Sequence, residues 1–275
     1  MSEEKCTHSC ETCGVSDCAA RNKIEKLKPN PNSKIGKTIA VMSGKGGVGK
    51  SMVTSLLAVS LMKEGKKVGI LDADVTGPSI PKAFGQNGYQ AYGDENGIFP
   101  AVTEHNIKLL SANNLLDDPT KPIIWRGSLI SNLVSQMYTM CIFDELDVLL
   151  IDMPPGTGDV PLTVFQQIPI NGAIFVTSPQ NLVGDVVAKS VEMAKEMNIE
   201  IIGLVENMAY VKCPHCEEKI RLFGENTGVD TAKKLGIPFL AELPIDPALS
   251  KLIDEGKIED FEGDYLKVAA SSISK

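Results

Sequence analysis

The stretch "VMSGKGGVGKS", residues 41–51, decides the fold. It fits the pattern Gly-x4-Gly-Lys-Ser, with Gly44, Gly49, Lys50 and Ser51 at the fixed positions. The short apolar run "TIAVMS" precedes the glycines, and a segment with helical periodicity follows them. A glycine loop between a strand and a helix points backbone N–H groups at an anion. The stretch therefore predicts a phosphate-binding loop in an α/β domain.

Strands and helices are expected to alternate along the rest of the chain. Apolar runs predict strands within 38–43, 67–74, 106–113, 146–156, 172–179, 199–208 and 238–246, with a hairpin around 94–97. Helical patterns cover 50–65, 126–140, about 181–197 and about 226–235. This alternation predicts a doubly wound, mostly parallel sheet of P-loop NTPase type with helices on both faces. The continuous Val, Ile and Leu runs suit strands covered on both faces.

Composition restricts the class of protein. The chain has 275 residues, 43% of them hydrophobic, and a formal net charge of −8. That charge argues against a general nucleic-acid binder, because neutralising phosphates requires a basic face. No apolar run approaches the roughly 20 residues of a membrane span, and the polar N-terminus has no signal-peptide core. We expect a cytoplasmic protein with neither a nucleic-acid nor a membrane partner.

The first 33 residues differ from the remainder. They are polar and rich in cysteine, and they end in "KLKPNPNS", a Pro/Asn linker that should not continue a helix. We expect residues 1–33 to form an appended metal-binding segment with its linker, and residues 34–275 to form the P-loop ATPase domain.

The chemistry of the loop follows from its residue types. Glycine N–H groups surround phosphate oxygens, Lys50 reaches the β- and γ-phosphates, and Ser51 offers a hydroxyl to Mg²⁺. The expected nucleotide-binding residues of the loop are Gly44, Lys45, Gly46, Gly47, Val48, Gly49, Lys50, Ser51 and Met52.

Carboxylates follow two of the expected strands. Asp152 in "LLIDMPPG" ends an apolar run at the Walker-B position, and Gly156 in the next loop is placed to sense the γ-phosphate. Asp72 and Asp74 lie at the end of "KVGILDAD". We expect Asp74 to orient or activate the attacking water and, with Ser51 and Asp152, to hold Mg²⁺. For Asp72 a role as a cap or turn carboxylate stays open.

Three motifs, KGGVGKS with the extra Lys45, DADVTGPS and DMPPGTGD, occur in the order found in the deviant-Walker-A ATPases. Within that superfamily the chain resembles the Mrp/ApbC-type iron–sulfur cluster carrier ATPases over about residues 37–250. The resemblance implies slow ATP hydrolysis in a homodimer. It also implies that a [4Fe–4S] cluster is received, with an assembly scaffold as possible donor, and delivered to apo iron–sulfur proteins.

The same resemblance assigns roles to single residues. Lys45 would cross a dimer interface to the partner's nucleotide and act catalytically with Lys50 and Asp74. Asn207 would contact the adenine. Met52 departs from the family, in which a small or hydroxyl residue is frequent near the α-phosphate. We expect altered nucleotide affinity from that change rather than its loss.

A pair of cysteines, Cys213 and Cys216 in "VKCPHCEEK", can bind one metal centre from a single tight turn. Tetrahedral and cubane sites need four ligands, and a symmetric dimer supplies the other two. The residues alone do not separate iron–sulfur from structural zinc, and a free redox pair is a third alternative. The family resemblance favours a [4Fe–4S] cluster bridging two subunits. His215, between the two cysteines, is expected to face solvent.

Four more cysteines, Cys6, Cys10, Cys13 and Cys18, lie within 13 residues of one another. Clustered thiols in a reducing compartment are more often metal ligands than disulfides. Some family members carry an N-terminal four-cysteine [4Fe–4S] motif with a wider first gap, so zinc stays an alternative here. The remaining cysteine, Cys141, is expected to be a small buried apolar residue.

Rival classes fit the chain less well. A membrane-positioning ATPase should end in a basic amphipathic helix, whereas residues 254–264 hold six acidic residues and one lysine. A DNA-partition ATPase needs basic surface. A nitrogenase-reductase type takes its cluster ligands from well-separated positions rather than from one CxxC. The alternative retained is a zinc-stabilised deviant-Walker-A ATPase that acts as a positioning or regulatory switch.

Overall fold

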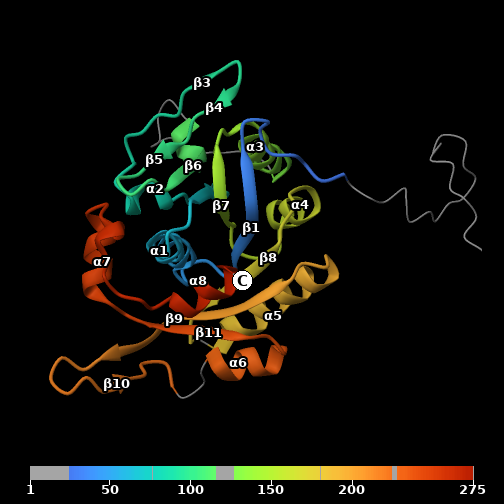
Figure 1. Cartoon of the computed structure of the whole chain (residues 1–275). Helices are drawn as coiled ribbons and strands as arrows, with labels where there is room; N and C mark the ends of the chain where they lie inside the picture. Colours follow the sequence, from blue (N-terminus) through green and yellow to red (C-terminus); the bar gives the residue numbers. More distant parts are fainter. Residues whose placement is uncertain (1–24, 76, 116–126, 180, 225–227, 275) are drawn as a thin grey trace, which may run out of the picture.

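The strand that leads into the glycine loop lies at the centre of the sheet (Figure 1). In the computed structural model, which describes residues 25–75, 77–115, 127–179, 181–224 and 228–274, β1 spans Lys34–Ser43 and pairs in parallel with β7 and β8. From Thr38 onward every residue of β1 is buried. A strand covered on both faces in this way is the pattern expected of the middle of a parallel α/β sheet.

The main sheet has the strand order β10-β9-β8-β1-β7-β2-β6-β5, with β11 paired to β9. Its strands after β1 are β2 (Val68–Asp72), β5 (Ala101–Val102), β6 (Lys108–Ser111), β7 (Glu145–Asp152), β8 (Gly172–Thr177), β9 (Ile201–Lys212), β10 (Lys219–Ile220) and β11 (Phe239–Pro244). A separate hairpin joins β3 (Gly93–Asp94) to β4 (Gly97–Ile98). Only β5 and β10 pair antiparallel within the main sheet, so the predicted mostly parallel sheet is confirmed.

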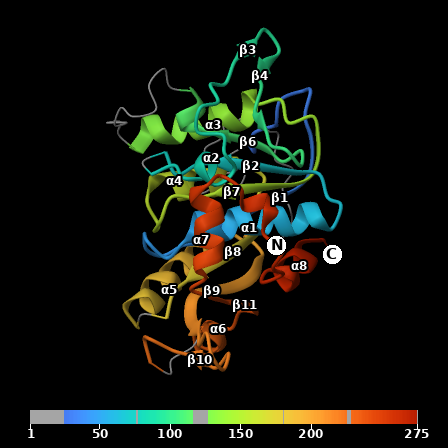
Figure 2. The same ribbon diagram turned by 90° about the vertical axis from the view of Figure 1, so that its left-hand side faces the viewer.

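Helices cover both faces of this sheet (Figures 1 and 2). Those on one side are α1 (Lys50–Lys63), α2 (Ile80–Ala83), α7 (Pro247–Asp254) and α8 (Lys267–Ser274). Those on the other are α3 (Gly127–Met140), α4 (Asp159–Gln167), α5 (Asn181–Glu196) and α6 (Gly228–Leu235). Short 3-10 turns occupy Ala112–Leu115 and Ile258–Asp260. None of the helices in the described ranges is long and apolar enough to cross a membrane.

Each strand and helix expected from the sequence is present, with shifts of a few residues at the ends. The helices without a prediction are α2, α4, α7 and α8. Each has at most nine residues, and α4 and α7 contain proline near their starts, so their periodicity is weak. The α7 start does carry a readable signal: Asp246 caps it by accepting from the N–H groups of Ala248 and Leu249.

Residues just before β1 contact the domain. Asn30 is buried, and its Nδ2 donates to the carbonyl oxygens of Asn96 (2.8 Å) and Met140 (3.1 Å). The Leu27 N–H donates to the carbonyl oxygen of Gln167 over 2.7 Å. The end of the expected linker is therefore fixed onto the domain. Residues 1–24 lie outside the described ranges, so an appended segment at 1–33 stays a prediction.

Replacing Asn30 tests how strongly this linker end is attached. Asn30→Ala removes both donations and leaves two carbonyl groups without their partner, so we expect a loss of about 1–3 kcal/mol in the free energy of unfolding. Urea unfolding measures it. Asn32→Ala removes a neighbouring amide with an exposed side chain and serves as the matched control. Equal stability of the two variants would contradict the attachment.

Candidate nucleotide and metal sites

The glycine loop, residues 44–49, joins β1 to α1 in a conformation that requires glycine. Gly47 and Gly49 have φ values of 82° and 78°, in the left-handed region that side chains disfavour. A Cβ at Gly49 would lie 2.2 Å from Asn207 Nδ2, and one at Gly44 would lie 2.5 Å from the Val187 nitrogen. The predicted loop is thus present, and close packing beneath it explains two of its glycines.

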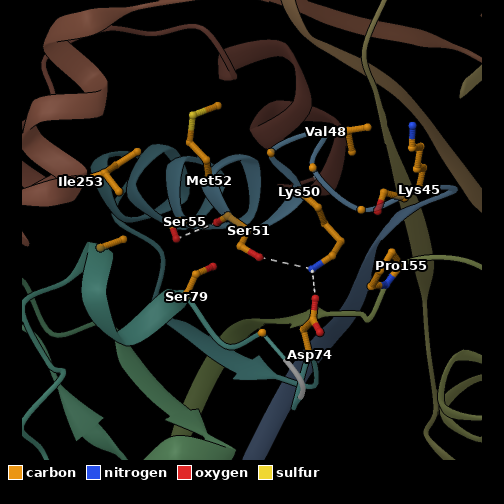
Figure 3. Close-up of a pocket in the computed structure, with 16 residues that line it drawn as sticks. Lys45, Val48, Lys50, Ser51, Met52, Ser55, Asp74, Ser79, Pro155 and Ile253 are labelled. Atoms are coloured by element: carbon orange, nitrogen blue, oxygen red, sulfur yellow. Dashed lines mark hydrogen bonds and ion pairs between the residues drawn. The ribbon is translucent and has the colours of Figure 1, made fainter. Parts of the chain in front are cut away.

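This loop forms one wall of a pocket of about 320 Å³ (Figure 3). The opposite walls come from the segment after β2, from Pro155 after β7, and from Ile253 of α7. Helix α1 begins at the pocket with no side-chain cap on its first N–H groups, so these donors are free for an anion. Of the expected binding residues, those lining the pocket are Lys45, Gly46, Gly47, Val48, Gly49, Lys50, Ser51, Met52 and Asp74.

Lys50 and Asp152 form a buried ion pair beneath the loop. Lys50 Nζ lies 2.6 Å from Asp152 Oδ2, and the two side chains are 5% and 0% exposed. Ser51 Oγ donates to the same oxygen over 2.6 Å, and Thr54 Oγ1 donates to Oδ1 over 2.5 Å. A buried carboxylate with a cation and two hydroxyl donors has its hydrogen-bonding capacity satisfied. Two of the expected Mg²⁺ ligands, Ser51 and Asp152, are therefore in direct contact, and their role at the metal stays a prediction.

Asp74 is the second carboxylate facing the pocket. Its Oδ2 lies 3.7 Å from Lys50 Nζ, and its side chain is 14% exposed. Figure 3 shows it pointing up from the segment after β2 toward Lys50 and Ser51. This position suits the expected roles in orienting water and holding Mg²⁺, which stay predictions.

Asp72 is a third carboxylate near Lys50 and is not among the residues that line the pocket. Its Oδ2 accepts from Ser111 Oγ (3.0 Å) and its Oδ1 from the Asp74 N–H (3.2 Å), so the turn interpretation describes part of its environment. It is buried and stands in register with Asp152 on the neighbouring strand. Burial, then the adjacent Asp152 charge, raises the pKa of Asp72 to about 8 despite Lys50. The raised pKa favours the protonated form of Asp72 at neutral pH.

The segment after Asp152 turns back toward the glycine loop. Gly156 has φ 85°, and its N–H donates to the Ser43 carbonyl oxygen over 2.8 Å. Pro155, one residue earlier, lines the pocket beside Gly46. If the Gly156 N–H donated to a γ-phosphate, it would give up its hydrogen bond to the Ser43 carbonyl oxygen. The expected sensing role of Gly156 stays a prediction.

Asn207 lies beneath the glycine loop rather than in the pocket wall. It is buried, and its Nδ2 donates to the Val48 carbonyl oxygen over 2.9 Å. Its Oδ1 is buried and has no hydrogen-bond partner in the structure. An acceptor without a donor suits the edge of a base, but the expected adenine contact stays a prediction.

Lys45 behaves differently from Lys50. Its side chain is exposed, and in Figure 3 it points away from Lys50 and Asp74. It forms no ion pair or hydrogen bond with the described residues. Such an exposed cation at the pocket rim suits the expected reach to a second subunit, which stays a prediction.

Cys213 and Cys216 lie on the turn of the β9–β10 hairpin. Glu217 has φ 59°, and the Cys213 N–H donates to the Glu218 carbonyl oxygen over 2.9 Å, which closes the turn. The backbone N–H groups of His215 and Cys216, followed by the Cys216 thiol, hydrogen-bond to the Cys213 sulfur and lower its pKa. We call this turn, residues 213–218, the knuckle. Its N–H groups stabilise a thiolate, which is the form of cysteine that binds metals. The donor set therefore fits a thiolate-bound metal centre.

Within the described residues no group of three or more metal-ligating side chains is present. The hairpin therefore offers two thiols, of which Cys216 is exposed and Cys213 half-buried. The expected N-terminal ligands Cys6, Cys10, Cys13 and Cys18 lie outside the described residues. Cys141 is fully buried in the core, as predicted, and burial raises the pKa of its thiol.

The hairpin is anchored at its base by one carboxylate. Glu242 on β11 forms ion pairs with Lys219 and, over 2.8 Å, with Arg221 Nη2. Burial alone would raise the pKa of Glu242, but its hydrogen bonds to these two cations lower it below the ordinary value. Lys219 also lies over the Tyr210 ring, 4.3 Å from its centroid.

Comparison with known proteins decides the family. The family model described as NUBPL iron-transfer P-loop NTPase matches residues 34–274. The chain belongs to this family. It is 42% identical to an iron-sulfur cluster carrier protein of Clostridium perfringens (92% of this chain, 94% of the relative). It is 45% identical to one of Methanocaldococcus jannaschii (92% and 89%). The expected resemblance to iron–sulfur cluster carriers is confirmed.

A solved structure extends the likeness to the fold. It is the nucleotide-binding protein of Archaeoglobus fulgidus, in complex with ADP and with cobalt found in it. It shares 47% of residues with this chain, with a TM-score of 0.75 over 84% of this chain and 90% of its own.

Several residues of this NTPase escaped prediction from the sequence. Thr54 completes the surroundings of Asp152, and Ser111 bonds to Asp72. Thr54 had a usable signal, since it lies one helical turn after Ser51 and so on the same face of α1. Glu242 had none, because its contact with the hairpin depends on how β11 aligns with β9.

The raised pKa of Asp72 predicts a pH dependence of stability. The folded chain keeps a proton on Asp72 that the unfolded chain loses above its ordinary pKa of 3.8. The free energy of unfolding should therefore fall as pH rises from about 4 to about 8. Asp72→Asn stays neutral and should flatten this decline, measured by urea unfolding at pH 5, 6, 7 and 8. Asp254→Asn removes an exposed carboxylate as control. Parallel declines in wild type and Asp72→Asn would refute the assignment.

Proposed function

We propose that this NTPase binds and hydrolyses ATP, slowly, and carries a [4Fe–4S] cluster that it passes to apo-proteins in the cytoplasm. The observation that carries the proposal is the presence, in one chain, of a phosphate loop and an exposed two-thiol knuckle. The names of the two carrier relatives support the cargo. An assembly scaffold is the proposed donor of the cluster.

The nucleotide half rests on the pocket. Loop N–H groups and the α1 N-terminus would hold the phosphates, while Ser51, Asp74 and Asp152 would hold Mg²⁺. The metal, when bound, neutralises charge on the phosphate oxygens. Lys50 then exchanges its bond to Asp152 for one to phosphate, and Asp74 orients the attacking water. The ADP in the Archaeoglobus relative supports a nucleotide here.

The cluster half requires two chains. One hairpin supplies two thiolates, a cubane needs four, and a two-fold axis brings in the partner's pair. Bridging between chains also leaves the cluster at a surface, where an acceptor's thiols can displace its ligands. Cys6, Cys10, Cys13 and Cys18 are proposed to hold a second cluster.

Reconstitution tests the cargo. After anaerobic incubation with iron and sulfide, the wild-type protein should show the Mössbauer spectrum of a [4Fe–4S] cluster and should transfer iron to an apo-protein. The double variant Cys213→Ala/Cys216→Ala should lose the iron bound at the hairpins and, with it, the dimer. Iron content measures the first loss and sedimentation measures the second. Cys141→Ala removes a buried thiol and should keep both. A protein that holds only zinc and transfers nothing is instead the zinc-stabilised switch.

Two lysine variants test the active site together. Lys50→Ala and Lys45→Ala should each lower ATP hydrolysis by about a hundredfold or more, since each removes a cation facing transition-state charge. Cluster loading should partly survive in Lys50→Ala. Mixed in equal amounts, the two variants should regain about a quarter of wild-type turnover, because half the dimers are mixed and each has one complete site. No recovery on mixing would show that Lys45 acts within its own chain or not at all.

A further inference from the structure

One strand passes both proposed sites. Asn207, in the middle of β9, lies under the glycine loop, and β9 ends at Lys212, directly before Cys213. Figure 1 shows β9 running on into the outlying hairpin with β10. At roughly 3.3 Å per residue, the six residues from Asn207 to Cys213 span about 20 Å. The covalent path between phosphate loop and thiols is therefore short and formed by a single element.

Two consecutive side chains of β9 contact the loop. Asn207 donates to the Val48 carbonyl oxygen, and its Nδ2 fills the space beside Gly49. Met208 Cε lies 3.6 Å from where a Cβ on Gly49 would be. In a regular strand, neighbouring side chains point to opposite faces. Contact of both with the same loop requires an irregularity in the strand at this point.

That irregularity is a bulge with a left-handed residue. On β11, Glu242 pairs with Glu206 and Pro244 pairs with Tyr210, so a step of two residues on β11 faces a step of four on β9. Within that step, Met208 has φ 58°, a conformation that an ordinary L-residue rarely adopts. The extra length of β9 is confined to residues 207–209.

Both ends of the bulge are held in place. Glu206 is buried before it, and after it the Tyr210 carbonyl oxygen accepts from the Ile245 N–H over 2.8 Å. The thiol hairpin beyond pairs through Lys212↔Lys219 and Val211↔Ile220 alone. A displacement of the Val48 carbonyl must therefore be taken up by the bulge or passed along β9 to the hairpin, whose base is anchored by Glu242.

We propose that the Asn207–Met208 bulge couples nucleotide binding at the loop to metal binding at Cys213 and Cys216. Phosphates bound by the loop N–H groups fix the Val48 carbonyl, and Asn207 in turn fixes the bulge and the strand leading to the hairpin. A hairpin ordered in advance loses less entropy when it binds metal. Nucleotide should therefore tighten metal binding. The inference rests on the two binding activities of the proposed function and not on cluster transfer.

Cobalt titration measures the coupling. The probe is Co²⁺, followed by its thiolate charge-transfer absorption, in the full chain with Cys6, Cys10, Cys13 and Cys18 changed to serine. Saturating Mg–ADP should lower the Kd for Co²⁺ by about fivefold or more, within the usual range of coupling between sites. Saturating Co²⁺ should lower the Kd for ADP by the same factor, because linkage is reciprocal.

Variants locate the coupling in the bulge. Met208→Gly relaxes the left-handed residue and removes the contact with Gly49, so the factor should fall below about twofold. Asn198→Gly relaxes another left-handed residue, φ 55°, in the turn before β9, and should keep the full factor. Asn207→Asp cannot donate to the Val48 carbonyl oxygen and is the second test. Its readout is the ratio of the Co²⁺ affinities measured with and without Mg–ADP, not the ADP affinity itself.

Two results would overturn the proposal: equal Co²⁺ affinity with and without Mg–ADP, or full coupling in both Met208→Gly and Asn207→Asp. Equal factors in the reciprocal titrations verify that both were measured at equilibrium. The first of the two results needs no change in β9, so absence of coupling would overturn the proposal even if a bulge variant fails to fold. The titration uses Co²⁺ in place of iron and sulfide. A result against the coupling is therefore distinguishable from a result against cluster carriage.

Discussion

One buried lysine amid three carboxylates is the constraint on which the nucleotide site depends. Lys50 meets Asp152 at 2.6 Å and Asp74 at 3.7 Å, and Asp72 stands beside Asp152 in strand register. A buried ion pair is stable only with good geometry and satisfied hydrogen bonds. Here the parallel pairing of β7 with β1 and β2 fixes the carboxylates, and α1 follows the loop at once, which fixes the lysine. Lys50 faces the charges of Asp152 and Asp74, and the raised pKa of Asp72 disfavours a third negative charge at this point.

This arrangement makes Lys50 an exchangeable partner. The lysine now neutralises the carboxylate that a divalent cation would otherwise neutralise, so Mg–nucleotide can enter without leaving a charge uncompensated. Asp152 and Ser51 would hold Mg²⁺ once Lys50 turned from Asp152 to the phosphates. Thr54 stays on the other carboxylate oxygen throughout and keeps Asp152 oriented. The exchange explains why the site needs both a lysine and a serine at consecutive positions.

The fold and most of the pocket were predictable because they rest on local signals. Continuous apolar runs predict β1 and β7, and the spacing from Gly44 to Ser51 specifies the loop between strand and helix. The surroundings of Asn207 were not predictable, since they depend on a bulge that sequence periodicity does not reveal. Nor was the protonation of Asp72, which follows from the register of two strands far apart in the chain. Contacts between distant elements were thus the missing part.

The surroundings of the two thiols differ in charge from the rest of the chain. The protein carries a net charge of −8, whereas the charges on and beside the knuckle balance: the cations are Lys212, Lys219 and Arg221, and the carboxylates are Glu217, Glu218 and Glu242. Thiolates bound to a metal centre add negative charge at this point, and nearby cations stabilise it. Because the charged side chains around the thiols balance, they do not by themselves oppose the approach of a second hairpin. The proposed bridging of two chains would therefore depend on the metal centre itself rather than on attraction between these side chains.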